Sequence, residues 1–442
     1  MTVMPPMLAA LSADDPAVAE WLAATGRSTA ALQELGQRRP GCGPARALVV
    51  LADNEALDDA TLRSELVLAH REAKEAGARE QSLVYAIYLY THRHYRATAD
   101  HLIVHFAQFP ADEVAGSMLS AFALAGPLEY REHGHVLTEQ QYALAGPESW
   151  PWASWLAGAR AEQGRPDDAW ALAEHALELN PRSGPAVHAR AHAEHDHGTG
   201  PTCTAFIDTW LAADPHAVQR RHLQWHAALQ SIAAGDFVDA RRRADTELHH
   251  GDVGMRSATN WRLLLAGQTP ARTAGLDHIH RLLAEPGGWA EVFHTFQLAL
   301  GLAVAADTDA LHALASRAAG DPRPDYAEVL APVALALAHL TAGRPGPAVD
   351  LLTALGDRTE RIGGVRVERE IIQDTLARAL IDAGQPQRAA HLLHHRTTTR
   401  RHHTYENLLL TTPAPAANTA RRPVVPPGDA VPAPRDHSGE VS

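Results

Sequence analysis

Two stretches of this chain carry histidines at helical spacing. His188, His192 and His195 form one set, and His222 and His226 form a second set further along the chain. Residues three, four and seven apart share one face of an α-helix, so each set predicts a histidine stripe. Imidazoles on such a stripe could bind a ligand, transfer protons or ligate a metal ion.

Buried core histidines are the alternative to a functional site. The chain has 28 histidines among 442 residues, so pairs four residues apart also arise by chance, as His391 and His395 do. In this interpretation the stripe residues are neutral, hydrogen-bonded side chains packed between helices. A third interpretation assigns acid–base or substrate contacts to His188, His192 and His226 without a metal, as catalytic residues.

A divalent metal ion is the interpretation with the most explicit geometry. Two histidines one turn apart can both direct a ring nitrogen at an ion about 2.0–2.1 Å away, and a ligand from a neighbouring helix would complete an open site. The chain has no His-Glu-x-x-His motif and no ligating cysteine pair. The metal ligands that we expect are His188, His192, His195 and His226.

Further side chains are expected to line the same groove. Trp225 lies between His222 and His226 in the sequence, which favours a place at the pocket wall. We expect His222 and His294 at the margin of a ligand shared by the other histidines. The full set of expected groove residues is His222, Trp225, Trp261, His294, Arg366 and Arg369.

The elements that position these residues are predicted to be helices. Only 5% of the residues are aromatic, Ala and Leu dominate, and no run shows the alternation typical of a strand. The class is therefore all-α. The net charge of -13 and the single lysine, Lys74, argue against a nucleic-acid partner, because phosphate binding requires clustered cations.

A repeat organises the helices. Gly164 is followed five residues later by Ala169, and the segment closes with Asn180-Pro181, as in a tetratricopeptide helical hairpin. Glycine permits the tight turn and alanine lets two helices approach closely. The same step recurs at the pairs Gly26 and Ala31, Gly235 and Ala240, Gly343 and Ala348, and Gly384 and Ala389, with a degenerate copy at His92 and Ala97.

Stacked hairpins of this kind predict a right-handed α-solenoid with a concave binding surface. We expect an N-terminal helical region over residues 1–78, the solenoid over 79–410 and a disordered tail rich in proline and alanine over 411–442. At least ten helices in antiparallel pairs are expected.

These motifs resemble the tetratricopeptide repeat protein 38 family from about Arg79 to about Leu410. Ala186 to Gly198 is similar to a family segment in which His188 and His192 occupy the two histidine positions. The other matching segments are Trp152 to Gly164, His222 with Trp225 and His226, Asn260 to Leu263, Val292 to His294, Arg361 to Gly364, and Arg369.

The chain also departs from the family pattern at polar positions. His195 stands where the family has glutamate, Gln224 where it has a second tryptophan, and Val365 to Glu368 replaces a Ser-His-Ala-Gln segment. The scaffold motifs are kept while these positions differ, which indicates a specialised relative. The resemblance implies a fold far more firmly than an activity.

Two functions follow as hypotheses. The first is a helical-repeat protein whose histidine-lined concave groove binds a protein segment or a small ligand. The alternative is an enzyme, with or without a metal, that acts on a small molecule in a specialised biosynthetic pathway. Two cysteines, the absence of a signal-peptide pattern and the absence of a long apolar run predict a cytoplasmic protein without a membrane partner. A homo-oligomer is compatible with this sequence.

Overall fold

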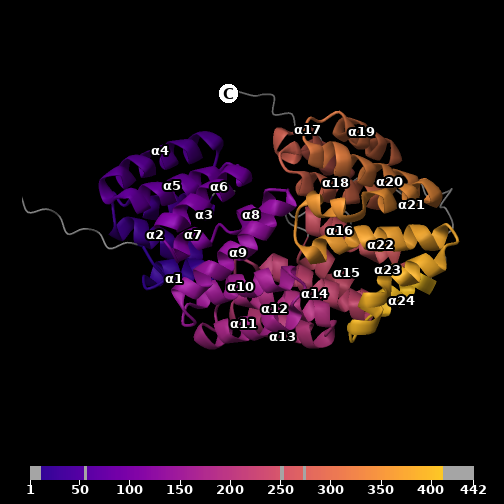
Figure 1. The fold of residues 1–442 in the computed structure, drawn as a ribbon, viewed down its shortest axis with the longest axis horizontal. Coiled ribbons are helices and arrows are strands. Elements are labelled where there is room, and N and C mark those ends of the chain that lie inside the picture. The colour runs from indigo at the N-terminus through magenta and orange to yellow at the C-terminus, as the bar shows by residue number, and fades with distance from the viewer. Residues whose placement is uncertain (1–10, 54–56, 249–252, 272–274, 412–442) are drawn as a thin grey trace, which may run out of the picture.

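The computed structural model describes residues 11–53, 57–248, 253–271 and 275–411, which form helices and, within these ranges, no strand (Figure 1). The all-α class and the number of helices are therefore confirmed. Most of the expected tail, from residue 412 onward, lies outside the described residues. No described helix has the length and apolarity needed to cross a membrane.

The helices follow one another around the molecule in chain order, from indigo through magenta to yellow (Figure 1). The first group is α1 (Pro16–Leu22), α2 (Ser28–Arg38), α3 (Gly43–Asp53), α4 (Asp59–Ala76), α5 (Ala78–Thr91), α6 (Tyr95–Gln108), α7 (Glu113–Gly116), α8 (Ser120–Leu124) and α9 (Leu128–Ala145). The central group is α10 (Trp150–Glu162), α11 (Pro166–Leu179), α12 (Gly184–His197), α13 (Pro201–Ala213), α14 (Arg220–Ala234) and α15 (Phe237–Thr246). The last group is α16 (Val253–Leu265), α17 (Leu276–Ala284), η1 (Pro286–Trp289), α18 (Val292–Val304), α19 (Thr308–Ala319), η2 (Asp325–Leu330), α20 (Ala331–Thr341), α21 (Pro345–Leu355), η3 (Gly356–Ile362), α22 (Arg366–Asp382), α23 (Pro386–Thr399) and α24 (Thr404–Thr411).

One type of turn joins many of the helix pairs. At Gly164, with φ of 71°, the backbone N–H donates to the carbonyl three residues back, and the next N–H donates to the carbonyl five residues back. This is the Schellman ending of a helix, which favours glycine because its central residue is left-handed. The same bonds and a positive φ occur at Gly235, Gly343 and Gly384, as the repeat predicts.

Three such turns contain no glycine at the left-handed position. In the hairpin assigned to Gly26 the left-handed residue is Ala24, and in the degenerate copy it is Arg93, one residue after His92. Ala306 forms a further turn that the Gly-to-Ala spacing does not detect. The hydrogen bonds of the turn offset the strain of a left-handed side chain at these positions, so the repeat extends beyond its glycines.

Alanine brings the central helices close together. Three small clusters each take one buried alanine from α10, one from α11 and one from α12. These residues recur at three- or four-residue intervals along each helix, so they form a continuous contact line. Because alanine adds only a methyl group, the three backbones approach closely, and this packing positions the histidine face of α12. The clusters are Ala153 with Ala176 and Ala186, Ala157 with Ala173 and Ala189, and Ala161 with Ala169 and Ala193.

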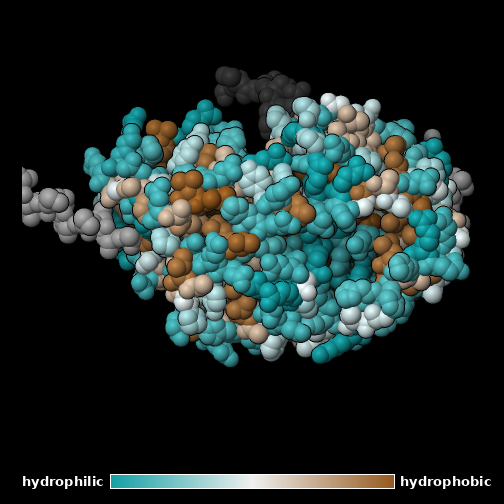
Figure 2. Space-filling view, viewed as in Figure 1, coloured by the Kyte–Doolittle hydropathy of each residue, from teal (hydrophilic) through white to brown (hydrophobic). Residues whose placement is uncertain are grey.

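Two larger hydrophobic cores flank this centre, beneath a face that is mostly hydrophilic with scattered hydrophobic residues (Figure 2). One extends from Leu11 to Trp152 and the other from Ile232 to Leu409. The first core is continuous across residue 78, where the N-terminal region was expected to end. That division of the chain stays a prediction.

The chain closes on itself through contacts between distant segments. Arg131 of α9 pairs with Glu360 at an N–O distance of 2.5 Å, and Arg96 of α6 pairs with Asp325 at 2.8 Å. Near the C-terminal end, the backbone N–H of Arg401 donates to the carbonyl of His197 at 3.0 Å. The first and last groups of helices therefore contact each other, and the last group also contacts the central group.

Candidate functional site

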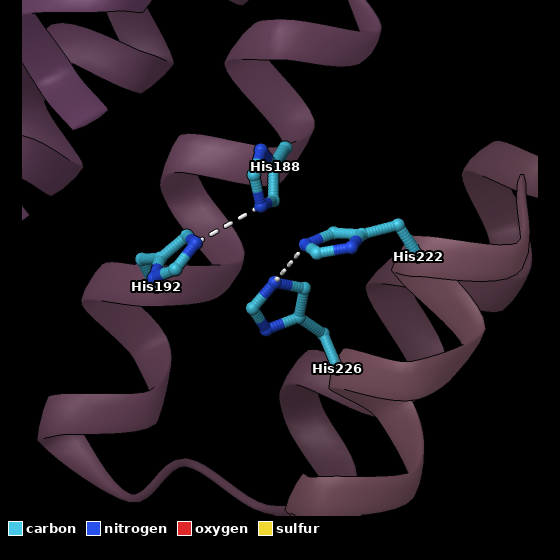
Figure 3. Close-up of side chains that lie close together, drawn as sticks. All are labelled: His188, His192, His222 and His226. Carbon is cyan, nitrogen blue, oxygen red and sulfur yellow. Dashed lines mark hydrogen bonds between the residues drawn. The ribbon is translucent and has the colours of Figure 1, made fainter. Parts of the chain in front are cut away.

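Four histidines meet between two neighbouring helices. His188 and His192 extend from α12, and His222 and His226 extend from α14 toward them (Figure 3). One ring nitrogen from each residue can be chosen so that all four lie within 4.8 Å of one another. We call these four residues the histidine tetrad.

The ring distances show how compact the tetrad is. Nε2 of His188 lies 2.9 Å from Nε2 of His192, and Nε2 of His222 lies 3.2 Å from Nε2 of His226 (Figure 3). The ring centroids of His192 and His226 are 4.5 Å apart, so the expected proximity of these residues is met. His222 was expected at the margin and instead belongs to the group, since its ring centroid is 4.5 Å from that of His188.

The nitrogen separations are close to those of a tetrahedral metal centre. Four nitrogens about 2.0–2.1 Å from one ion are separated from each other by roughly 3.3–3.4 Å. Small rotations of the imidazoles would therefore bring the tetrad into ligand geometry. No carboxylate or thiol among the described residues joins the group.

Burial keeps the tetrad neutral. Burial is the largest cause that lowers the pKa of every member, to about 3 for His192 and to about 4 for His222. Neighbouring histidines lower the pKa of His188 and His226 further, because a second positive charge at this distance would be repelled. Neutral imidazole is the form that ligates a metal ion, so the site needs no deprotonation at neutral pH.

A cavity of about 820 Å³ adjoins the tetrad. His188 and His192 form part of its wall, together with residues of α9 and α10. Its lining repeats at helical spacing on α9, at Arg131, Gly134 and His135. The cavity volume falls within the range of small-molecule sites, about 300–1,000 Å³.

His195 lies outside the tetrad although it shares a helix with two members. It is three residues beyond His192, and its Nε2 lies 3.0 Å from Oε2 of Glu370 on α22. Burial and the charge of Arg400 lower the pKa of His195 to about 4, so the ring donates an N–H to the carboxylate. That hydrogen bond occupies Nε2, and the structure does not bring His195 to the other expected metal ligands.

His195 belongs to a buried ionic network instead. Arg396 lies 2.6 Å from Asp374 and 2.8 Å from Glu406, and Arg400 lies 2.7 Å from Glu370 and 3.0 Å from Glu406. Asp374, Arg396, Arg400 and Glu406 are buried, and the side chain of Glu370 is 11% exposed. The network holds α22, α23 and α24 together and joins them to α12.

The two tryptophans expected in the groove lie in the core. Trp225 is 1% exposed and packs with Leu229 and Val367, and its ring centroid is 5.0 Å from that of His226. It therefore packs against His226 within the core and is not one of the residues that line the cavity. Trp261 is also buried and donates its indole N–H to the hydroxyl of Thr375 at 2.9 Å.

The remaining expected groove residues hold the helices together. Arg366 contacts Asp196, and its backbone N–H donates to the carboxylate of Glu162 at 2.7 Å. Arg369 lies 3.3 Å from Glu162 as well. His294 lies on α18, partly buried, and does not belong to the tetrad.

Arg131 and His135 are cavity residues that the sequence analysis does not select. Both lie on the cavity face of α9, four residues apart. Their spacing with Gly134 and Thr138 is a sequence signal of one helix face, but many exposed faces have the same pattern. The packing of α9 against α6, α8 and α10 decides which of its faces meets the cavity.

No protein-family model matches this chain, and no curated protein matches its sequence.

Proposed function

We propose that this chain is a metal-binding helical-repeat protein, with one divalent transition-metal ion held by His188, His192, His222 and His226. The observation that carries the proposal is the convergence of four ring nitrogens from two helices within 4.8 Å. Imidazole ligands suit zinc, copper, nickel and iron. The ion would lie at the wall of the cavity, where it could polarise or bind a small molecule.

The hydrogen bonding of the tetrad favours this function over a purely structural role. A core histidine is normally satisfied by protein partners. Nδ1 of His226 is buried and has no hydrogen-bond partner among the described residues. A buried polar group left unpaired costs about 1–3 kcal/mol, and such a cost is typical of sites kept for binding.

The cavity supports a small ligand in preference to a protein segment. Its volume of about 820 Å³ fits one small molecule. Arg131, which lines the cavity, also pairs with Glu360 and so joins two segments that are distant in the sequence. A peptide groove would be long and shallow. We therefore place metal-assisted chemistry on a small molecule ahead of partner binding.

We also propose that the wider architecture is a right-handed α-solenoid of tetratricopeptide-like hairpins. We propose further that the chain is a divergent relative of the tetratricopeptide repeat protein 38 family. The recurrent Schellman turns and the contacts between alternate helices, such as α10 with α12 and α12 with α14, support this architecture. A cytoplasmic location remains part of the proposal and is supported by two free, buried cysteines.

Metal analysis of the purified protein tests the function directly. The protein is dialysed against a chelator, titrated with Zn²⁺, Ni²⁺, Cu²⁺ or Co²⁺, and analysed for bound metal. We expect one equivalent in the wild type and a loss of stoichiometric binding in each of the variants His188→Ala, His192→Ala, His222→Ala and His226→Ala.

A matched control comes from an exposed pair with the same spacing. His391 and His395 lie four residues apart on α23 and are exposed. The double variant H391A/H395A is expected to bind metal like the wild type. Wild-type metal content in all four tetrad variants, together with a lower melting temperature, would contradict the proposal and favour a structural role.

A further inference from the structure

The tetrad contains no group that can neutralise a metal ion. Its four members are imidazoles, and no carboxylate among the described residues joins them. The nearby carboxylates are already engaged. Glu194 pairs with Arg190 at 2.7 Å, Asp196 contacts Arg366, and Glu162 accepts the backbone N–H of Arg366. A divalent ion in this site would retain its full charge in a buried setting, where an unpaired charge is unfavourable.

The same cavity contains a second cationic group. Arg131 lines it and is 5% exposed, and its Nε is buried without a hydrogen-bond partner among the described residues. Its two other nitrogens contact the side chain and the carbonyl of Glu360, both at 2.5 Å. At least the Nε–H of Arg131 is therefore left for a ligand.

His135 is a neighbour of Arg131 on this wall. It lies one turn from Arg131 on α9 and lines the cavity. Burial, followed by the charges of Arg131, Arg369 and Arg160, lowers its pKa to about 4. His135 is therefore neutral at pH 7, and each of these arginines also pairs with a glutamate.

Aromatic side chains make up another part of the lining. Trp21, Tyr90, Phe122 and Trp155 all border the cavity. They offer flat apolar surfaces, which favour a ligand with a hydrophobic body. The cavity thus combines an apolar wall with two places that attract negative charge.

From these contacts we infer that the cavity binds a small carboxylic acid with an apolar, aromatic body, whose carboxylate neutralises the tetrad-bound ion and is attracted by Arg131. This inference rests on the proposed metal site and names its ligand class. An oxygen of the carboxylate would be a fifth ligand of the ion, beside the four imidazoles. Charge-assisted contacts of this kind are among the strongest hydrogen bonds and ion pairs in proteins.

Cobalt is the probe that separates the two proposals. The full-length protein is loaded with Co²⁺, whose visible absorption reports the number of ligands, and is then titrated with 1-naphthoate. We expect 1-naphthoate to weaken the intense four-coordinate absorption as a fifth ligand enters. The neutral isostere 1-naphthamide should bind at least about tenfold weaker, and inorganic phosphate should not reproduce the affinity because it lacks the apolar body.

Two substitutions change the net charge around Arg131 in opposite directions. Arg131→Gln should weaken 1-naphthoate at least about tenfold and leave Co²⁺ affinity unchanged. Glu360→Gln keeps the carbonyl that Arg131 contacts but removes the negative charge beside Arg131 and Arg369, so it should strengthen 1-naphthoate binding. Glu360 is about one-third exposed, which keeps this variant informative if Arg131→Gln does not fold.

The outcomes are distinguishable. Failure of the wild type to bind Co²⁺ would overturn both the proposed metal site and this inference. Normal Co²⁺ binding with an unchanged spectrum on adding 1-naphthoate would overturn the inference alone. Equal affinity for 1-naphthoate and 1-naphthamide, or for phosphate and 1-naphthoate, would also overturn it.

Discussion

His192 and His195 lie three residues apart on α12, yet they belong to different kinds of buried polar site. His192 faces three other imidazoles, whereas His195 donates to Glu370 within the ionic network of Arg396, Arg400, Asp374 and Glu406. In the network every charge has an opposite charge beside it. In the tetrad the imidazoles are neutral, no carboxylate of the described part of the chain joins them, and Nδ1 of His226 has no hydrogen-bond partner there.

The difference shows how the two sites relate to stability and to binding. A fully paired network is complete without any further component, and removing one partner leaves another charge buried. A group of neutral imidazoles is incomplete by itself and gains most when an ion enters. We expect the network to dominate the unfolding free energy and the tetrad to dominate the response to metal.

The largest effect is expected from breaking the ionic network. Arg396→Ala leaves the carboxylates of Asp374 and Glu406 buried without this partner and should lower the unfolding free energy by about 3–5 kcal/mol. Urea denaturation followed by circular dichroism measures the loss. Arg388→Ala on the exposed side of the same helix is the control, with an expected change within about 0.5 kcal/mol. Equal effects of the two substitutions would remove the distinction.

A somewhat smaller effect is expected where the network segment docks on α12. Gly198 has φ of 62°, and an added Cβ would lie 2.5 Å from Cβ of Arg400. Gly198→Ala should cost roughly 3 kcal/mol, since both a strained backbone and overpacking contribute. Gly164 has a similar φ of 71° and open space around it, so Gly164→Ala should cost only about 1–2 kcal/mol. Identical melting temperatures for the two variants would show that α12 does not need this contact.

Metal should stabilise the tetrad and leave the network unaffected. At a free metal concentration 100 times the dissociation constant, the wild type should gain about 2.7 kcal/mol. His226→Ala is expected to lose this gain, whereas His195→Gln is expected to keep it because His195 does not belong to the tetrad. Thermal melting with and without Zn²⁺ provides the measurement. If His195→Gln also removed the gain, the separation of the two sites on α12 would be wrong.

The smallest effect concerns the pH dependence of the metal-free protein. Burial lowers the pKa of His192 to about 3 in the folded state, below the value of 6.5 expected for an unfolded chain. Between these values the unfolded chain binds a proton that the folded protein does not, so stability falls as the pH decreases from about 6.5 toward 3. His192→Gln should reduce this slope by about 1.4 kcal/mol per pH unit, as measured by denaturation at pH 4.5, 5.5 and 6.5. An unchanged slope would show that His192 is protonated in the folded protein.

Part of the candidate site was predictable from helical spacing alone. His188 and His192, and separately His222 and His226, are each four residues apart, so each pair had to share a helix face. Which faces meet depends on the packing of α12 against α14, and this packing is not a local property. For that reason His222 was expected at the margin, His195 in the site, and Arg131 not at all.

The sequence by itself determined the helical class, the hairpin turns at Gly164, Gly235, Gly343 and Gly384, and the histidine stripes, because propensity, left-handed glycines and the 3.6-residue period are local properties. The turns at Ala24, Arg93 and Ala306 are held by the same local hydrogen bonds, but no glycine marks them, so the glycine spacing does not find them. Tertiary structure decided that His195 turns toward Glu370 and that α9 faces the cavity. Contacts between segments more than a hundred residues apart set these arrangements, and no sequence period records them.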